Sequence, residues 1–228
     1  MNKAYIRLLG ANLLLLIITI LNSFLNFLNS YTIILFLLLY FIFIYYFVGY
    51  ERNNKRYQKD IIIEVLIISF SYYIITYLSG LFLGFNQTGY SLKFLNILKN
   101  ILPILLLIPL AELIRYVLVS KGYIYKSIVI FIFINFVMLD INLFIHAYNN
   151  GIINFILEIL IPSIAKNILL IYLIYKAGYK PTIVYRLIFE IPVYILPIFP
   201  SLGLYLGPLV SFLFPMLSFY LFYNSFRK

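Results

Sequence analysis

The chain contains no cysteine, no tryptophan and a single histidine among its 228 residues. Without cysteine it has neither a disulfide framework nor thiol chemistry. His146 alone cannot supply the three or four protein ligands that a zinc site needs. The sequence therefore excludes zinc catalysis and cysteine nucleophiles, and we expect no cofactor and no metal.

Charge is also scarce, because 11% of the residues are charged whereas 64% are hydrophobic. A soluble domain contains about 25% charged and about 45–50% apolar residues. Apolar runs recur from one end of the chain to the other, and no segment between them is long enough to form a soluble domain. The composition predicts an all-α polytopic transmembrane bundle in which residues 1–228 form one integral domain in the lipid bilayer.

A helix that crosses the hydrocarbon core needs about 20 mainly apolar residues. Reading the apolar runs between polar segments predicts eight spans, at 6–27, 31–50, 61–84, 100–119, 127–146, 156–176, 182–200 and 205–223. The first resembles a signal sequence at its basic end, but its apolar part is long and no small-residue cleavage site follows. We therefore expect a retained anchor.

The positions of lysine and arginine predict the orientation, since short cytoplasmic loops are enriched in both. Twelve of the 17 basic residues fall on the side of the two termini, and only Lys93 and Lys99 fall on the other side. Both termini are therefore expected to be cytoplasmic. The net charge of +10 is explained by insertion and does not indicate nucleic-acid binding. Abundant Ile, Asn, Lys, Tyr and Phe are typical of an AT-rich bacterial gene, which indicates a bacterial cytoplasmic membrane.

Ionisable residues inside spans are rare, because a charge at mid-bilayer costs about 2.5–3.5 kcal/mol on insertion scales. Six such residues form a candidate intramembrane charge network: Glu112, Arg115, Asp140, Lys166, Arg186 and Glu190. Glu112 and Arg115 are three residues apart, and Arg186 and Glu190 are four apart. Each of these two pairs should therefore share one helix face.

Depth along the helices predicts which of these charges meet. Counted from the cytoplasmic ends, the two arginines lie about 6 Å deep and the two glutamates about 10–12 Å deep. They predict a quartet of alternating sign, with each arginine between two carboxylates. Asp140 and Lys166 differ in depth by only about 5 Å and form a second expected pair. Both a structural role, fixing which helices are neighbours, and a role in proton or solute relay are compatible with this pattern.

Helix-breaking prolines interrupt the span at 182–200, and they are Pro192, Pro197 and Pro200. Pro192 removes a backbone hydrogen bond, which lipid tolerates only where the freed carbonyl faces protein or water. The span at 182–200 should therefore be interior. Spans four and six share this feature, with Pro103, Pro109 and Pro162. We expect these three spans to form an inner set and the first two spans to lie outside it.

Catalytic residues of intramembrane proteases are not recognisable in the chain. Asp140 is the only aspartate inside a span, which leaves no aspartyl dyad. No G-x-S-x-G turn accompanies His146, which we expect to be an interfacial polar residue. The string AELIR superficially resembles the Glu-Glu-x-x-x-Arg motif of the prenyl-protein-processing membrane proteases. It does not match that motif, because it has a single glutamate and no pair of histidines follows it. We therefore predict no catalytic residue.

Three segments nevertheless resemble the multi-pass membrane region of bacterial signal peptidase I-like proteins: LPILLLIPLAELIRY (102–116), ILEILIPSIAKNILLIYLIYKAGYKPTIVYRLIFE (156–190) and YILPIFPSLGLYL (194–206). In that family a Ser/Lys dyad performs the chemistry, with the serine in a Ser-x-Met-Pro motif. This chain lacks the motif, because PMLS at 215–218 has the wrong order. The resemblance implies a membrane domain that supports signal-peptide processing or secretion beside a separate catalytic domain or subunit.

A carrier for a small solute or a lipid is the alternative function. Broken inner helices and charges near the middle of the membrane are typical of such carriers. The sequence leaves both alternatives open.

Overall fold

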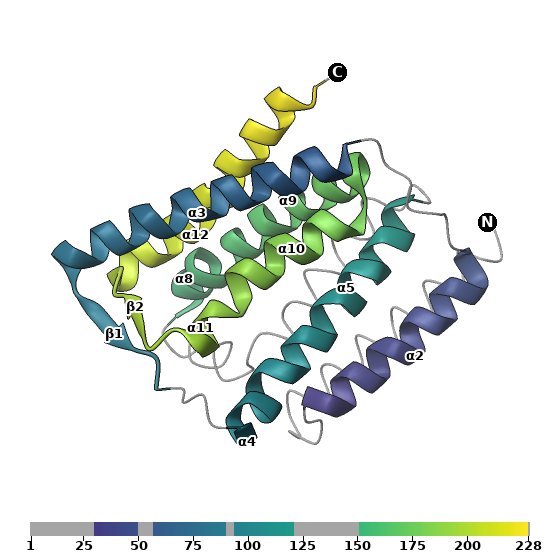
Figure 1. The fold of residues 1–228 in the computed structure, drawn as a ribbon, viewed down its shortest axis with the longest axis horizontal. Helices are drawn as coiled ribbons and strands as arrows, with labels where there is room; N and C mark the ends of the chain where they lie inside the picture. The colour runs from purple at the N-terminus through teal and green to yellow at the C-terminus, as the bar shows by residue number, and fades with distance from the viewer. Residues whose placement is uncertain (1–29, 50–56, 90–93, 121–150, 228) are drawn as a thin grey trace.

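The computed structural model describes residues 30–49, 57–89, 94–120 and 151–227, and these residues are mostly helical (Figure 1). The first helices are α2 (Ser30–Val48), α3 (Gln58–Leu83), α4 (Phe94–Asn96) and α5 (Leu102–Ser120). They are followed by α8 (Ile152–Phe155), α9 (Ile161–Ala177), α10 (Tyr179–Glu190), α11 (Pro192–Ile195) and α12 (Gly203–Ser225). The predicted spans at 6–27 and 127–146 lie outside the described residues, as do Asp140 and His146.

Four described helices are long and apolar enough to cross a membrane, and they cover Gln58–Leu83, Phe94–Ser120, Ile153–Ala177 and Leu206–Ser225. A shorter apolar helix covers Tyr31–Tyr46. These five segments coincide with predicted spans at 31–50, 61–84, 100–119, 156–176 and 205–223. The helical class of the prediction is confirmed for the described residues, and four of their helices have the length and composition of membrane-spanning helices.

The centre of the bundle is formed by α5, α9 and α10, which contact one another. Helix α2 packs against the far side of α5, and α3 and α12 pack against the α9–α10 side (Figure 1). Most buried positions of the longer helices lie on α5 and α9, including Ile114, Leu169 and Leu173. This arrangement agrees with the expected inner set of three proline-containing spans.

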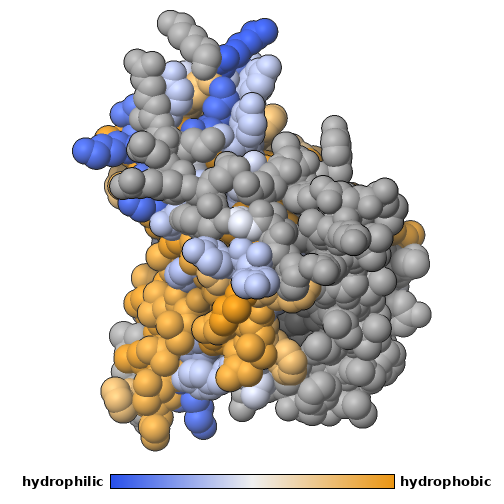
Figure 2. Space-filling view, turned by 90° about the vertical axis from the view of Figure 1, so that its right-hand side faces the viewer, coloured by the Kyte–Doolittle hydropathy of each residue, from blue (hydrophilic) through white to orange (hydrophobic). Residues whose placement is uncertain are grey.

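The outer helices expose large apolar side chains. Phe70 and Phe82 of α3 are 69% and 90% exposed, and Leu217 of α12 is 58% exposed. On the side of the molecule where α2 lies, Figure 2 also shows an apolar surface, with hydrophilic residues above and below it. Contiguous apolar surface of this kind is unfavourable in water and suits hydrocarbon. The exposed faces of α3 and α12 are therefore the faces that a bilayer would cover.

The predicted span at 182–200 is interrupted after Glu190, as its helix-breaking prolines predict, and it does not continue as a helix to residue 200. Helix α10 ends at Glu190, α11 is four residues long, and Ile198–Pro200 forms strand β2. Pro192 has no N–H to donate to the carbonyl of Ile188. The hydroxyl of Tyr73 in α3 donates to that carbonyl instead, at 2.7 Å. A tyrosine from a neighbouring helix thus satisfies the backbone group that the proline leaves unpaired.

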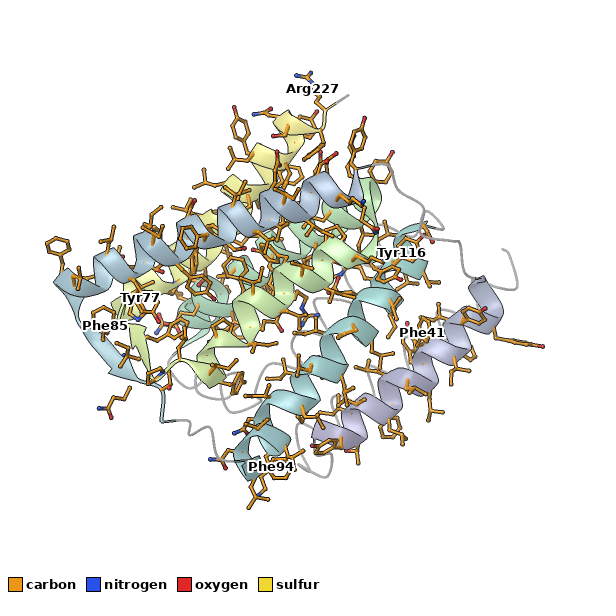
Figure 3. All side chains as sticks on the ribbon, viewed as in Figure 1. Phe41, Tyr77, Phe85, Phe94, Tyr116 and Arg227 are labelled. Atoms are coloured by element: carbon orange, nitrogen blue, oxygen red, sulfur yellow. The ribbon has the colours of Figure 1, made fainter. Side chains whose placement is uncertain are left out.

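Strand β2 pairs antiparallel with β1 (Phe85–Gln87), with Asn86 opposite Phe199. The all-α prediction did not include this two-stranded ribbon. Gly80 permits it, because a Cβ there would lie 2.7 Å from the ring of Phe85. The rings of Tyr77 and Phe85 lie together at this end of the molecule (Figure 3). The ribbon therefore closes the end of α3 against the chain that follows α11.

The segment 179–200 runs beside α3 over the whole length of that helix. Near the beginning of α3, Gln58 Nε2 donates to the carbonyl oxygen of Ala177 at 3.2 Å. Near its end, Tyr77 donates to the carbonyl oxygen of Ile198 at 2.9 Å. The interrupted segment α10–α11–β2 consequently covers the same thickness as the long apolar helix α3.

Two π-helical turns precede prolines on the central helices. They are η1 (Ile97–Ile101), two residues before Pro103, and η2 (Ile156–Leu160), two residues before Pro162. In each, the residue before the proline donates its N–H to the carbonyl five residues back. This widened turn relieves the clash between a proline ring and the carbonyl four residues earlier. The same local device thus shapes the entry into both α5 and α9.

The π turn before Pro103 also receives a tyrosine hydroxyl. In this turn the N–H of Leu102 donates to the carbonyl of Ile97. Pro103 has no N–H that could donate to the next carbonyl, that of Leu98. Tyr31 of α2 donates its hydroxyl to the Leu98 carbonyl. This contact explains physically how α2 is fixed against α5 at that end.

Candidate functional site

Five charged side chains from three central helices form one continuous series of contacts, which we call the charged chain. In order of contact it consists of Arg115, Glu112, Arg186, Glu190 and Lys166. Helix α5 supplies the first two members, α10 the next two and α9 the last. Residues separated by more than 70 positions in the sequence thus meet inside an apolar bundle.

The α5 end of the charged chain is completely buried. Glu112 and Arg115 lie one turn apart, and Nη1 of Arg115 is 2.9 Å from both carboxylate oxygens of Glu112. Both side chains have 0% exposure. The alignment follows from their spacing of three residues, which places the two side chains on the same helix face.

Arg186 joins the two helices at the middle of the charged chain. Its Nη1 donates to Glu112 Oε1 at 3.0 Å across the α5–α10 contact. Its Nε and Nη2 donate to the two oxygens of Glu190 at 2.7 and 2.9 Å. Two parallel bonds of this kind are the strongest geometry for an arginine–carboxylate pair. Arg186 lies between two carboxylates, as the sequence predicts.

Lys166 forms the other end of the charged chain. Its Nζ donates to Glu190 Oε1 at 2.6 Å. The side chains of Lys166 and Glu190 are 29% and 24% exposed, unlike those at the α5 end. The expected partner of Lys166 was Asp140, which lies outside the described residues. Among the described residues Lys166 contacts a carboxylate on α10, because α9 and α10 pack side by side and both side chains lie at the same level. The pairing with Asp140 stays a prediction.

The predicted quartet is also incomplete at Arg115. Among the described residues Arg115 reaches Glu112 but not Glu190, so it does not lie between those two carboxylates. Its Nη2 donates to Oδ1 of Asn167 on α9, at 2.8 Å. Arg186 occupies the place between Glu112 and Glu190.

Asn167 is a site residue that the sequence analysis missed. Its side chain is 0% exposed and its Nδ2 donates to the carbonyl oxygen of Ser163 at 2.8 Å. Nδ2 is therefore held by its own helix, which turns Oδ1 toward Arg115. The available signal was a lone asparagine in the middle of an apolar run, directly after Lys166. Such a residue in a span requires a polar partner.

The charged chain stabilises one particular arrangement of the three helices. Removing a charge from water into a low-dielectric interior is costly, and only a well-aligned partner offsets that cost. Each carboxylate of the charged chain accepts from two cationic side chains. A shift of α10 relative to α5 would therefore leave a buried charge without its partner.

The described residues contain no group of three or more histidine, cysteine, aspartate or glutamate side chains that could hold a metal ion. Among these residues Lys166 contacts the carboxylate of Glu190. What the arrangement offers is fixed positive and negative charge inside a membrane-like bundle.

Comparisons of the chain with protein-family models, with curated proteins and with solved structures find no match.

Proposed function

We propose that this chain is an integral membrane component of the signal peptidase I-like type, which supports signal-peptide processing or protein secretion without carrying a catalytic dyad. The observation that supports this most is where the resembling segments lie. The segments at 102–116, 156–190 and 194–206 are α5, α9 with α10, and the chain around the ribbon. All five members of the charged chain fall within the first two of these segments.

The resemblance consists of charges and prolines scattered over about 100 residues. In the structure these residues act together: the charges contact one another, and the prolines set the π turns and the interruption after α10. A pattern of this kind describes a packing unit. A rigid unit built around buried ion pairs is suited to hold a catalytic domain or subunit in a fixed position at the membrane.

The topology that belongs to this proposal has eight spans with both termini in the cytoplasm. The support is the excess of basic residues on one side of the predicted spans. Gln87 in the ribbon and Ser225 at the end of α12 would then face opposite sides. Because the chain has no cysteine, single cysteines at these two positions report directly on orientation. Labelling at 87 but not at 225 by an impermeant reagent on intact cells supports the proposal, and the reverse contradicts it.

The functional test is depletion of the chain in its own cells, followed by measurement of secreted proteins that still carry their signal peptides. We expect precursors to accumulate and to disappear when the unaltered chain is restored. Glu112→Gln should fail to restore processing, whereas Glu158→Gln, outside the charged chain, should restore it. Normal processing in depleted cells would contradict the proposal, as would cleavage of a signal peptide by the purified chain alone.

Transport of a small solute or a lipid is the second candidate, and one observation favours it. The Glu190–Lys166 pair is about one quarter exposed and lies where α10 is interrupted. Interrupted helices beside charged groups near mid-membrane are typical of carriers. Substrate flux into vesicles that depends on Lys166, together with normal signal-peptide processing in depleted cells, would favour transport over the scaffold role.

A further inference from the structure

The two ends of the charged chain differ in exposure, and the exposed end lies deep in the bundle. Lys166 lies eleven residues before Ala177, and Glu190 lies eleven residues after Tyr179. At a rise of 1.5 Å per residue both are about 16 Å from the end of the bundle where Gln58 contacts Ala177. The apolar helix Ile153–Ala177 is about 37 Å long at the same rise. The exposed ion pair is therefore near its middle.

An ion pair whose side chains are partly exposed at this depth requires a polar environment. A charged side chain facing hydrocarbon would be strongly disfavoured, and charges within spans almost always face the bundle interior or water. Phe70 of α3, at a comparable distance from the same end, is 69% exposed and apolar, as expected for a lipid-facing position. The exposed parts of Lys166 and Glu190 do not suit that environment.

At the end of the charged chain formed by Lys166 and Glu190, which we call the open end, hydrogen-bond donors outnumber their acceptors. Glu190 accepts three N–H groups, two from Arg186 and one from Lys166. The ammonium of Lys166 has three N–H donors. Among the described residues one of these donors is used, by Glu190. A group that completes the shell of Lys166 must therefore be an acceptor, and one with negative charge would fit the ammonium best.

We propose that water reaches Lys166 from one side of the membrane and that its ammonium binds a small anionic group, such as a carboxylate. Glu190, itself fixed by Arg186, holds the ammonium in place and leaves its remaining donors for the ligand. This inference goes beyond the scaffold role and does not depend on it, because it rests on the depth, exposure and donors of the pair. In a carrier the same position would receive the anionic group of the solute.

The accessibility test uses single cysteines in the cysteine-free chain, reconstituted in nanodiscs. Lys166→Cys should react with an impermeant anionic methanethiosulfonate at least ten times faster than two control variants. The controls are Phe70→Cys, at an exposed position that we expect to face lipid, and Leu170→Cys, at a position on the same helix as Lys166 that is 0% exposed. Rates for Lys166→Cys as slow as those of the controls would overturn the proposal.

The charge test keeps Lys166 in place and puts the cysteine at Ile191, next to Glu190. This variant also serves if Lys166→Cys fails to fold. The ratio of labelling rates for anionic over cationic reagents should fall several-fold when Lys166→Gln is added. Sodium acetate should slow anionic labelling only when Lys166 is present. An unchanged ratio, or no effect of acetate, would show that Lys166 does not bind anions.

An acidic group of the same chain is the competing occupant. If Asp140→Asn alone makes Ile191→Cys much more reactive toward the anionic reagent, an internal carboxylate covers Lys166 and the proposal is wrong. If Asp140→Asn leaves both the rate and the effect of acetate unchanged, the site takes its anion from solution.

Discussion

The two ends of the charged chain contain the same kind of contact in different surroundings. At the α5 end Glu112 and Arg115 are 0% exposed, whereas at the α9 end Glu190 and Lys166 are about one quarter exposed. Buried charges that lose a partner have no water to replace it, so the first end holds helices in place. Charges that keep access to a polar environment can exchange partners. The α5 end, which we call the closed end, therefore contributes stability, whereas the end formed by Glu190 and Lys166 is suited to bind a ligand.

Among substitutions in the charged chain, Glu112→Gln should lower the unfolding free energy most. The substitution leaves Arg115 and Arg186 without their shared carboxylate in the buried part of the bundle. Loss of one partner of a buried pair costs about 3–5 kcal/mol of unfolding free energy. Unfolding in detergent measures the loss, with Glu158→Gln as the control. Equal stability of the two variants would show that the closed end is not a determinant of the fold.

Asn167→Ala should have the next largest effect. It removes the oxygen that accepts from Arg115 and breaks the only described side-chain link from α9 to the closed end. A hydrogen bond to a charged group contributes about 1.5–3 kcal/mol to stability. The matched control is Asn100→Ala in the π turn before α5, which should change unfolding by less than about 0.5 kcal/mol. If the two variants behave alike, Asn167 does not position Arg115.

Tyr73→Phe tests whether the tyrosine hydroxyl stabilises the chain where α10 is interrupted. The variant keeps the ring and loses the hydroxyl that donates to the carbonyl of Ile188. We expect a loss of about 0.5–1.5 kcal/mol, the net contribution of one hydrogen bond. Tyr175→Phe is the control, since the Tyr175 side chain is 60% exposed. No difference between these variants would show that the hydroxyl of Tyr73 does not stabilise the carbonyl freed by Pro192.

Lys166→Met should have the smallest effect on stability. If the open end is in contact with water, its ion pair behaves like an exposed salt bridge and contributes at most about 1 kcal/mol. Thermal unfolding in detergent should therefore change little, although anion-dependent labelling at Ile191→Cys is lost. A destabilisation as large as that of Glu112→Gln would show that both ends are buried alike.

Much of the helical framework could be predicted from the sequence because it depends on composition and chain length. Apolar runs of about 20 residues have few alternatives to a helix in lipid. The described helices accordingly coincide with predicted spans to within a few residues, except at 182–200. The pairing of Arg186 with Glu112 was also predictable, since both depth and helix face follow from the regular rise of a helix.

The remaining features depend on contacts between distant segments. The sequence shows that Pro192 interrupts a helix, but not that Tyr73 satisfies the freed carbonyl or that the chain then forms a strand. Similarly, the sequence does not show that Lys166 contacts Glu190, because that contact depends on which helices are neighbours. Asn167 was missed because its amide carries no formal charge. A buried amide nevertheless needs hydrogen-bond partners, as a buried charge does.

The contact between Glu112 and Arg186 holds α5 and α10 together at the closed end. A double-mutant cycle in detergent measures this contact, with unfolding free energies determined for Glu112→Gln, Arg186→Met and the double variant. We predict that each single change is strongly destabilising and that the double variant recovers part of the loss, with a coupling of about 1 kcal/mol or more. Losses that add to within about 0.3–0.5 kcal/mol would contradict it.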